Sequence, residues 1–189
     1  MTFAVWITGL PGSGKSAIAE ALLNDLKKHS INATYFNMDL IRKKLVEKPE
    51  YSNKERDIAY KKFADSGISE YAKGKNVIYD ATAHKLKYRN HARKRIKKFV
   101  EIYVKCPLSI CIKRETKRKS KQIMAELYKK ALIRKRKGKK FKRLGRVIGI
   151  DVRYQENKKA ELAIKSDKIN PSKAAKIIFT FLKSKNYIT

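Results

Sequence analysis

The sequence predicts an α/β fold in which helices cover both faces of a doubly wound parallel sheet of about five strands. Short apolar runs alternate with stretches of helical periodicity along the chain, which is the pattern of strands joined by crossover helices. The first apolar run leads directly into a glycine-rich turn. The chain has 189 residues and is 42% hydrophobic, which suffices for one core, so we expect a single domain over residues 1–189.

The glycine-rich turn follows a buried strand predicted over residues 3–8 and fits the complete phosphate-loop pattern. In this pattern, glycines let backbone N–H groups face a phosphate, the lysine reaches the outer phosphates, and the serine hydroxyl holds Mg²⁺. A helix predicted over residues 17–28 directs its N-terminus at the anion. The pattern predicts a P-loop NTPase fold that binds ATP and Mg²⁺. The expected nucleotide-binding residues are Gly9, Leu10, Pro11, Gly12, Ser13, Gly14, Lys15 and Ser16.

Two carboxylates follow the next two predicted strands. Asp39 comes directly after a strand over residues 33–38, and Asp80 ends an apolar run over residues 77–79. Ligands bind beyond the carboxyl ends of the strands in open parallel sheets. Asp80 therefore resembles a Walker B carboxylate in the shell of Mg²⁺. The alternative for each carboxylate is to cap the helix that follows it, which for Asp39 is a short helix over residues 40–45.

Apolar spacing predicts the other elements as well. They are a helix over residues 54–73, a basic helix over 85–98, a strand over 99–104, a helix that opens at Pro107 and continues through a basic segment to about residue 137, a strand over 160–164 and a closing helix over 171–185. Glycines interrupt the pattern after residue 137, so we expect a mobile loop over residues 138–150.

The formal net charge of +31, from 48 Lys and Arg against 17 Asp and Glu, creates a field that attracts polyanions. Residues 113–146 hold 17 of the basic residues and only two acidic ones. We interpret residues 114–146 as a basic helical lid that closes over the ATP phosphates, with Arg114 and Arg118 as nucleotide contacts. The alternative is a surface that binds RNA.

Other features bear on location and on metal chemistry. The sequence shows no secretory leader and no apolar run that approaches the ~20 residues of a membrane span, so we expect a soluble cytoplasmic protein. Cys106 and Cys111 are too far apart for a CxxC pair, and we expect buried, reduced thiols. His84 lies in a predicted loop, where it contacts a phosphate or the acceptor, or is simply solvated.

Several segments resemble the adenylylsulfate kinase family, whose members use MgATP to phosphorylate the 3′-hydroxyl of adenosine 5′-phosphosulfate. The similarity follows the chain in order. It is carried by the strand and loop over residues 6–16, by NMDLIR at 37–42, which is similar to the family's DGDNIR, by Tyr51-Ser52 followed by Arg56, by LYKKA at 127–131, and by GIDVRY at 149–154, which is similar to GIDDPYE.

The resemblance implies roles for residues on the acceptor side. Asp39 would be the catalytic carboxylate that orients the acceptor hydroxyl and takes up its proton, together with Lys15 on the phosphoryl group. Arg42 and Arg56 would hold the anionic groups of the acceptor nucleotide. Two further substrate contacts are expected, namely Tyr51 by stacking on the adenine and Lys129 of the lid.

The sequence departs from the family pattern at four places on the acceptor side. Asn37 replaces the first carboxylate of DGD, Ala59 replaces an asparagine, and Val147 replaces an aromatic residue that clamps the adenine. The loop over residues 80–85, DATAHK, resembles that of polynucleotide and seryl-tRNA kinases. A kinase for RNA or aminoacyl-tRNA is therefore the alternative, and an RNA-binding protein that uses ATP as a switch is a third hypothesis. The expected partners are the small nucleotide substrate, RNA in these alternatives, and a second copy of the chain in a homodimer.

Overall fold

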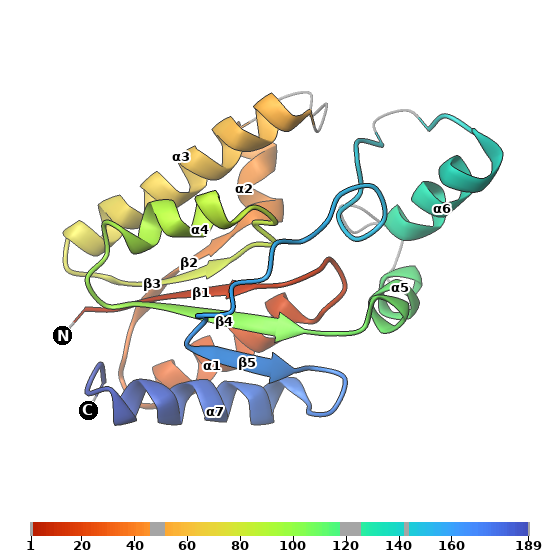
Figure 1. The fold of residues 1–189 in the computed structure, drawn as a ribbon. Coiled ribbons are helices and arrows are strands. Elements are labelled where there is room, and N and C mark those ends of the chain that lie inside the picture. The colour runs from red at the N-terminus through yellow and green to blue at the C-terminus, as the bar shows by residue number, and fades with distance from the viewer. Residues whose placement is uncertain (1, 46–51, 118–125, 142–143, 189) are drawn as a thin grey trace.

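A computed structural model describes residues 2–45, 52–117, 126–141 and 144–188. They form a parallel sheet of five strands in the order β2-β3-β1-β4-β5, which confirms the predicted sheet (Figure 1). Every strand pair is parallel, so the carboxyl ends meet at one edge. The strands are β1 (Ala4–Thr8), β2 (Ala33–Asn37), β3 (Asn76–Asp80), β4 (Phe99–Lys105) and β5 (Leu162–Lys165).

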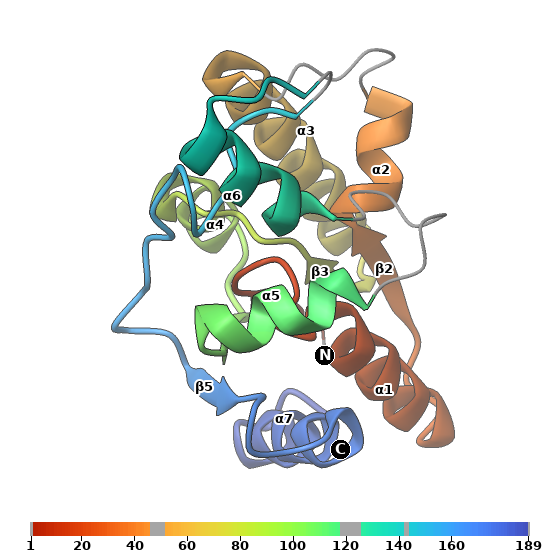
Figure 2. The ribbon, with the colours of Figure 1, turned by 90° about the vertical axis from the view of Figure 1, so that its right-hand side faces the viewer.

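Helices cover both faces of this sheet. The helices are α1 (Lys15–Lys28), α2 (Met38–Leu45), α3 (Asn53–Ala72), α4 (Leu86–Arg93), α5 (Leu108–Thr116), α6 (Leu127–Lys137) and α7 (Pro171–Ser184). Helices α1 and α7 lie on one face, and α3 and α4 lie on the other (Figure 1). Helices α5 and α6 lie beyond the carboxyl ends of the strands, where Figure 2 shows the loop after β1 next to α5.

Strand β1 explains why the first apolar run is continuous. Its successive side chains point to opposite faces, and both faces are covered. Val5 and Ile7 join the core under α1 and α7. Trp6 joins the core on the other face, where it stacks on Tyr79 with ring centroids 4.5 Å apart and meets the edge of Phe63 at 5.6 Å.

The basic segment differs from its prediction, because it is not one continuous helix. Helix α5 ends at Thr116, and α6 begins only at Leu127. Glu126 has a φ of 59°, which is a left-handed conformation that interrupts any helix. The buried carboxylate of Glu115 accepts hydrogen bonds from the backbone of Leu127 (2.7 Å) and Tyr128 (3.3 Å). A charge from α5 thus caps the first turn of α6, and this contact fixes the corner between the two helices.

Two other predictions need adjustment. Helix α4 ends at Arg93, five residues before the predicted end, because the chain must turn before it enters β4 at Phe99. The loop predicted over residues 138–150 ends in an ordered turn, in which Gly149 N donates to Val152 O (2.7 Å) and the backbone N of Val147 donates to Asp151 Oδ2 (2.6 Å). The mobility of this loop stays a prediction.

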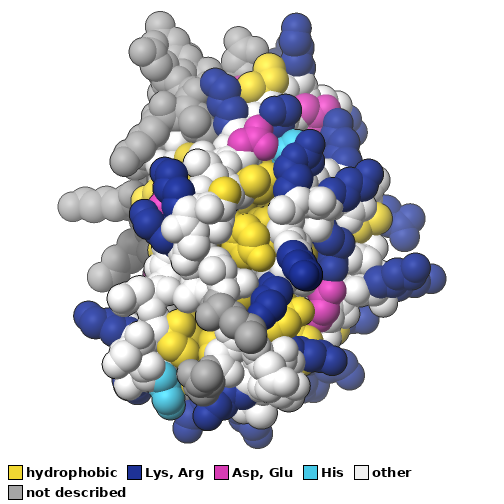
Figure 3. Space-filling model, turned by 90° about the vertical axis from the view of Figure 1, so that its left-hand side faces the viewer, with side chains coloured by type: hydrophobic (Ala, Val, Ile, Leu, Met, Phe, Trp, Pro, Cys, Tyr) yellow, Lys and Arg dark blue, Asp and Glu magenta, His cyan; other side chains and the backbone are white. Residues whose placement is uncertain are grey.

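The surface carries the basic excess widely. Figure 3 shows the face at the amino ends of the strands, where Lys and Arg side chains are spread across the surface and apolar atoms are exposed between them. The charge is therefore not confined to the predicted lid. Within the described ranges, none of the helices has both the length and the apolar content that crossing a membrane requires.

Candidate active site

A pocket lies where the carboxyl ends of β1, β2 and β3 meet α3 and the segment after α6. Its charged lining combines four basic residues with three carboxylates, so opposite charges meet in one cavity. The lining residues are Pro11, Gly12, Gly14, Lys15, Ser16, Asn37, Met38, Asp39, Arg42, Arg56, Tyr60, Asp80, Ala81, Thr82, Glu115, Leu127, Arg146, Val147 and Ile148. The structure thus brings together nine of the predicted site residues, namely Pro11, Gly12, Gly14, Lys15, Ser16, Asp39, Arg42, Arg56 and Asp80.

The glycine-rich turn has the backbone shape that its sequence predicts. Gly12 has a φ of +79°, and a Cβ atom there would lie 2.5 Å from the carbonyl oxygen of Cys111. The loop and α5 can therefore lie in contact only because position 12 carries no side chain. Helix α1 begins at Lys15, two residues earlier than predicted, so its N-terminus faces the pocket directly.

Hydrogen bonds hold the loop from several directions. Lys15 Nζ donates to the carbonyl oxygen of Leu10 (2.9 Å), and Tyr128 Oη of α6 donates to that of Pro11 (2.9 Å). Ser13 O accepts a hydrogen bond from Arg114 Nη1 (3.3 Å). Arg114 does not line the pocket, because its guanidinium lies behind the loop and also donates to Ser166 O (2.7 Å).

Asp80 lies at the carboxyl end of β3, with 3% of its surface exposed. Its Oδ2 accepts hydrogen bonds from Asn37 Nδ2 (2.7 Å) and from the hydroxyl of Tyr35 (2.9 Å), both on the neighbouring strand β2. Asp80 does not cap α4, whose N-cap residue is Lys85. Its carboxylate and the Ser16 hydroxyl both line the pocket and supply the oxygen ligands that Mg²⁺ prefers.

Asp39 lies in the first turn of α2, and the cap of this helix is Asn37 instead. Asn37 Oδ1 accepts hydrogen bonds from the backbone N–H groups of Asp39 (3.0 Å) and Leu40 (3.1 Å). The alternative role of Asp39 as a helix cap is therefore wrong, because the residue before the helix already occupies those donors.

Two arginines from different helices line the side of the pocket near Asp39. Arg42 of α2 forms an ion pair with Glu55 (3.1 Å), and its guanidinium lies 5.9 Å from the ring centre of Tyr60. Arg56 of α3 is buried and donates through Nη2 to the carbonyl oxygen of Arg146, whereas its Nη1 has no hydrogen-bond partner within the described residues. Burial, together with the positive charge of Arg42, lowers the pKa of Arg56. A buried cation with an unpartnered donor suits an anionic ligand.

Other predicted site residues do not line the pocket. Lys129 is exposed and forms an ion pair with Glu126 (3.0 Å). His84 is neither solvated nor in the pocket lining: its side chain is 1% exposed, and neither ring nitrogen has a hydrogen-bond partner within the described chain. Tyr51 and Arg118 lie outside the described residues.

Several pocket residues were not predicted from the sequence. Tyr60 lies four residues after Arg56 on α3, so helical spacing places both on one face and is the signal that could have found it. Glu115 is one of the two acidic residues in the basic segment, and its place in the pocket lining was not predicted. Arg146 and Ile148 reach the pocket through the turn after α6, which no local pattern predicts.

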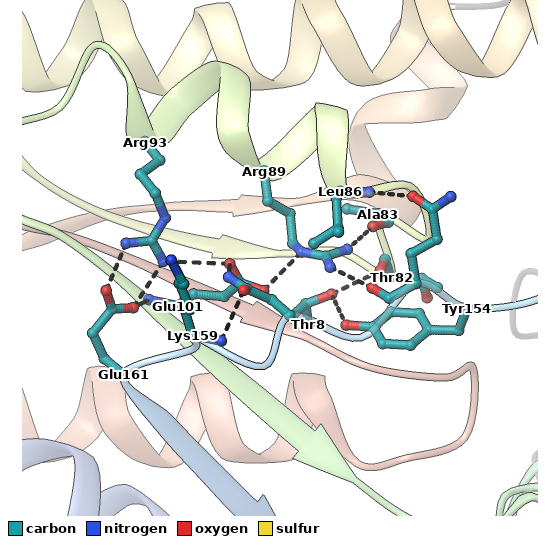
Figure 4. Close-up of polar contacts among 12 residues, drawn as sticks. Thr8, Thr82, Ala83, Leu86, Arg89, Arg93, Glu101, Tyr154, Lys159 and Glu161 are labelled. Carbon is teal, nitrogen blue, oxygen red and sulfur yellow. Dashed lines mark hydrogen bonds and ion pairs between the residues drawn. The ribbon is translucent and has the colours of Figure 1, made fainter.

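Buried polar contacts hold the loop after β3 in place (Figure 4). Thr8 of β1 donates through its hydroxyl to the carbonyl oxygen of Thr82 (2.7 Å) and lies 3.0 Å from the hydroxyl of Tyr154. Arg89 of α4 donates to the carbonyl oxygen of Ala83. The loop that follows Asp80 is therefore tied to the strand that leads into the glycine-rich turn.

Comparisons with known proteins agree with this geometry. The model of the adenylylsulphate kinase family matches residues 1–165. The probable adenylyl-sulfate kinase of Archaeoglobus fulgidus is 31% identical over 168 residues, which are 89% of this chain and 98% of that protein. The adenylyl-sulfate kinase of Clostridium acetobutylicum is 31% identical over 188 residues, 95% of this chain and 82% of that protein.

A solved structure extends the similarity to three dimensions. The Mycobacterium tuberculosis APS kinase CysC, in complex with AMPPNP and APS, matches with a TM-score of 0.79 and 25% sequence identity, over 96% of this chain and 98% of that chain. The parallel sheet, the glycine-rich turn and the pocket beside it are thus found together with a family match over most of the chain. The chain belongs to the adenylylsulfate kinase family.

Proposed function

We propose that this protein transfers the γ-phosphoryl group of ATP to the 3′-hydroxyl of adenosine 5′-phosphosulfate (APS). The observation that carries this proposal is the shared pocket, which joins the phosphate loop to a second basic group formed by Arg42, Arg56 and Arg146. Phosphoryl transfer between two anionic nucleotides needs positive charge on both sides of the group in flight. Membership of the adenylylsulfate kinase family supports the same substrates.

The donor side is formed by the loop and the start of α1. Backbone N–H groups of the loop and Lys15 bind the ATP phosphates, and Ser16 and Asp80 would hold Mg²⁺. When bound, this ion neutralises charge on the phosphates. Among the described residues, no group of three or more His, Cys, Asp or Glu side chains is placed so that it could hold a metal ion. If Mg²⁺ binds here, its other ligands would be phosphate oxygens and water, as is usual for this ion.

The acceptor side is formed by α2 and α3. Asp39 orients the acceptor hydroxyl and takes up its proton, and Arg42 and Arg56 bind the anionic groups of APS. Nη1 of Arg56 supports this role, because it is a buried donor without a hydrogen-bond partner among the described residues, and Arg56 lines the pocket. Tyr51 and Lys129 remain predicted substrate contacts, and Arg118 remains a predicted ATP contact.

An apolar wall completes the acceptor side. Val147, Ile148 and the ring of Tyr60 line the pocket there. We propose that the adenine of APS lies against this wall. Because Val147 replaces the clamping aromatic residue of the family, stacking comes from one side only, and we expect weaker binding of APS than a two-sided clamp gives.

RNA and aminoacyl-tRNA serve as the competing acceptors in the test. The relatives reported above are named for adenylyl sulfate, so the comparisons do not favour an RNA acceptor. Purified protein is incubated with γ-labelled MgATP and either APS or bulk tRNA, at low and at high salt. We expect label in the small nucleotide at either salt concentration. Label in tRNA alone would refute the proposed acceptor.

A variant separates catalysis from binding. Asp39→Asn keeps the size of the side chain and removes the proton acceptor, so transfer should fall by about 10²–10⁴-fold while ATP binding persists. The matched control is Asp25→Asn on α1, which lies outside the pocket lining. Full activity of Asp39→Asn would remove Asp39 from the mechanism.

A further inference from the structure

The amide side chain of Asn37 contacts both the helix that carries Asp39 and the carboxylate of Asp80. Asn37 Oδ1 caps α2 by accepting the backbone N–H groups of Asp39 and Leu40, at 3.0 and 3.1 Å. On the other side of the same amide, Nδ2 donates to Asp80 Oδ2 (2.7 Å) and to the hydroxyl of Tyr35 (3.1 Å). Asn37 therefore links the helix that carries Asp39 to the carboxylate of Asp80.

The register of the sheet creates this contact. Asn37 of β2 lies directly beside Asp80 of β3. Tyr35 precedes Asn37 by two residues, so both side chains lie on the same face of β2. The Tyr35 hydroxyl also donates to Asp80 Oδ2, at 2.9 Å. Both donors thus converge on one oxygen of the carboxylate, which fixes its orientation, and neither of them occupies Oδ1.

Only an amide meets all the demands at position 37. The side chain must accept two backbone N–H groups through one atom and donate to a carboxylate through the other. Aspartate can also cap a helix, but here it would place a second negative charge about 3 Å from Asp80. The family pattern has a carboxylate at position 37, whereas this chain has the carboxylate directly across the strand pair.

We propose that Tyr35 and Asn37 are positioning residues that hold Asp80 as a ligand for the nucleotide-bound divalent cation. In this chain Asp80 on β3 then takes the place of the carboxylate that the family pattern has at position 37 on β2. This inference rests on the proposed role of Asp80. The departure at Asn37 is then compensated by Asp80 on the metal side of the pocket, and it leaves the acceptor unchanged. The amide also joins the metal side to the acceptor side through α2.

Four variants test this inference: Tyr35→Phe, Asp80→Asn, Asn37→Asp, and the double variant Asn37→Asp/Asp80→Asn. For each, Mg²⁺ is titrated at fixed ADP, and the increase in thermal unfolding temperature gives the Mg²⁺ midpoint without any turnover. Loss of an orienting partner typically weakens metal binding by about 10–100-fold. We expect Tyr35→Phe to raise the Mg²⁺ midpoint by about tenfold while ADP binding without Mg²⁺ is unchanged.

The double variant, which exchanges the amide and the carboxylate between positions 37 and 80, is the decisive comparison. Asp80→Asn should raise the Mg²⁺ midpoint most, and Asn37→Asp should destabilise the protein because two carboxylates meet. The double variant keeps one carboxylate and one amide in contact and keeps a side chain that caps α2, so it should recover most of the loss in Asp80→Asn. A merely structural role of Asn37 would not produce this rescue.

The outcomes distinguish the proposed role of Asp80 from its positioning by Tyr35 and Asn37. An unchanged Mg²⁺ midpoint in folded Asp80→Asn would overturn the proposed role of Asp80. A raised midpoint in Asp80→Asn, with none in Tyr35→Phe and no rescue in the double variant, would leave that role intact and overturn the positioning of Asp80 by Tyr35 and Asn37. Tyr35→Phe keeps the ring, so its unfolding temperature without ligand shows whether the fold is retained.

Discussion

Arg89 and Glu101 form an ion pair in which both side chains are completely buried, with Nε 2.8 Å from Oε1 (Figure 4). Arg89 also donates to the carbonyl oxygens of Ala83 and of Gln155, the latter at 2.6 Å. One guanidinium thus joins α4, β4, the loop after β3 and the segment that returns from the pocket. The loop after β3 contributes Ala81 and Thr82 to the pocket lining, so the ion pair of Arg89 helps to hold this part of the lining in place.

Replacing Arg89 by Met should destabilise the protein severely. The substitution leaves Glu101 buried without its main partner, and breaking a buried pair in this way costs about 3–5 kcal/mol. Unfolding in urea gives the free energy directly. The control is Lys87→Met on the same helix, which removes an exposed pair with Asp57 (2.7 Å) and should cost less than about 1 kcal/mol. Equal losses in the two variants would show that the buried pair has no special role.

His84 should make the protein less stable in mild acid. Burial, and then the positive charges of Arg56 and Lys85, lower the pKa of His84 from 6.5 to about 4. Between these values the unfolded chain binds a proton that the folded protein excludes, so stability falls as the pH decreases from 6.5 to 4. The full loss is about 3 kcal/mol.

The variant His84→Leu tests this expectation. It removes two buried ring nitrogens that have no hydrogen-bond partner in the described structure, so stability near pH 7.5 should be retained or increased. Urea unfolding at a series of pH values should show a smaller loss of stability between pH 6.5 and 4. The control is His29→Gln, at an exposed position after α1. An identical pH profile in wild type and His84→Leu would contradict the buried, neutral state.

Two glycines with the same φ separate the cost of a positive φ from the cost of a steric clash. Gly12 and Gly74 both have a φ of +79°, but a Cβ atom at Gly74 meets nothing within 4 Å. Gly74→Ala should therefore cost only about 1–2 kcal/mol, the usual cost of a left-handed residue. In Gly12→Ala the clash with Cys111 O adds about 1–3 kcal/mol and shifts the loop against α5, so ATP binding should fall as well. Calorimetric titration with ATP checks the second effect, and equal ATP affinity in both variants would refute it.

Local patterns sufficed to predict the shape of the glycine-rich turn and the helix that follows it. The loop from Gly9 to Ser16 is contiguous, so its glycines and the following helix specify its shape without help from distant residues. Asp39 and Asp80 were found because parallel strands end at a common edge, a rule that depends only on where each strand stops.

Long-range contacts account for what the sequence did not reveal. Glu115 caps α6 across a corner that no helical periodicity shows, so the basic segment looked like one helix. In the sequence Tyr35 is an ordinary strand residue. Its hydrogen bond to Asp80 depends on the register of β2 against β3, which the sequence does not show. His84 follows a strand, and in the folded chain it is buried with the ring of Tyr88 from α4 against it, a contact that the local sequence does not indicate.

Lys15 provides the most direct test of the donor side. It lines the pocket at the first position of α1, where its ammonium group can stabilise the negative charge that the phosphoryl group carries during transfer. Removing one such oriented charge typically lowers kcat by about 10²–10³-fold, so Lys15→Ala should lose nearly all transfer to APS. The control is Lys27→Ala in the last turn of the same helix, where the side chain is exposed and the activity should be unchanged. Steady-state transfer from labelled ATP measures both variants, and the unfolding temperature of Lys15→Ala shows whether the protein remains folded. Wild-type turnover in folded Lys15→Ala would mean that the loop binds something other than the transferred phosphate.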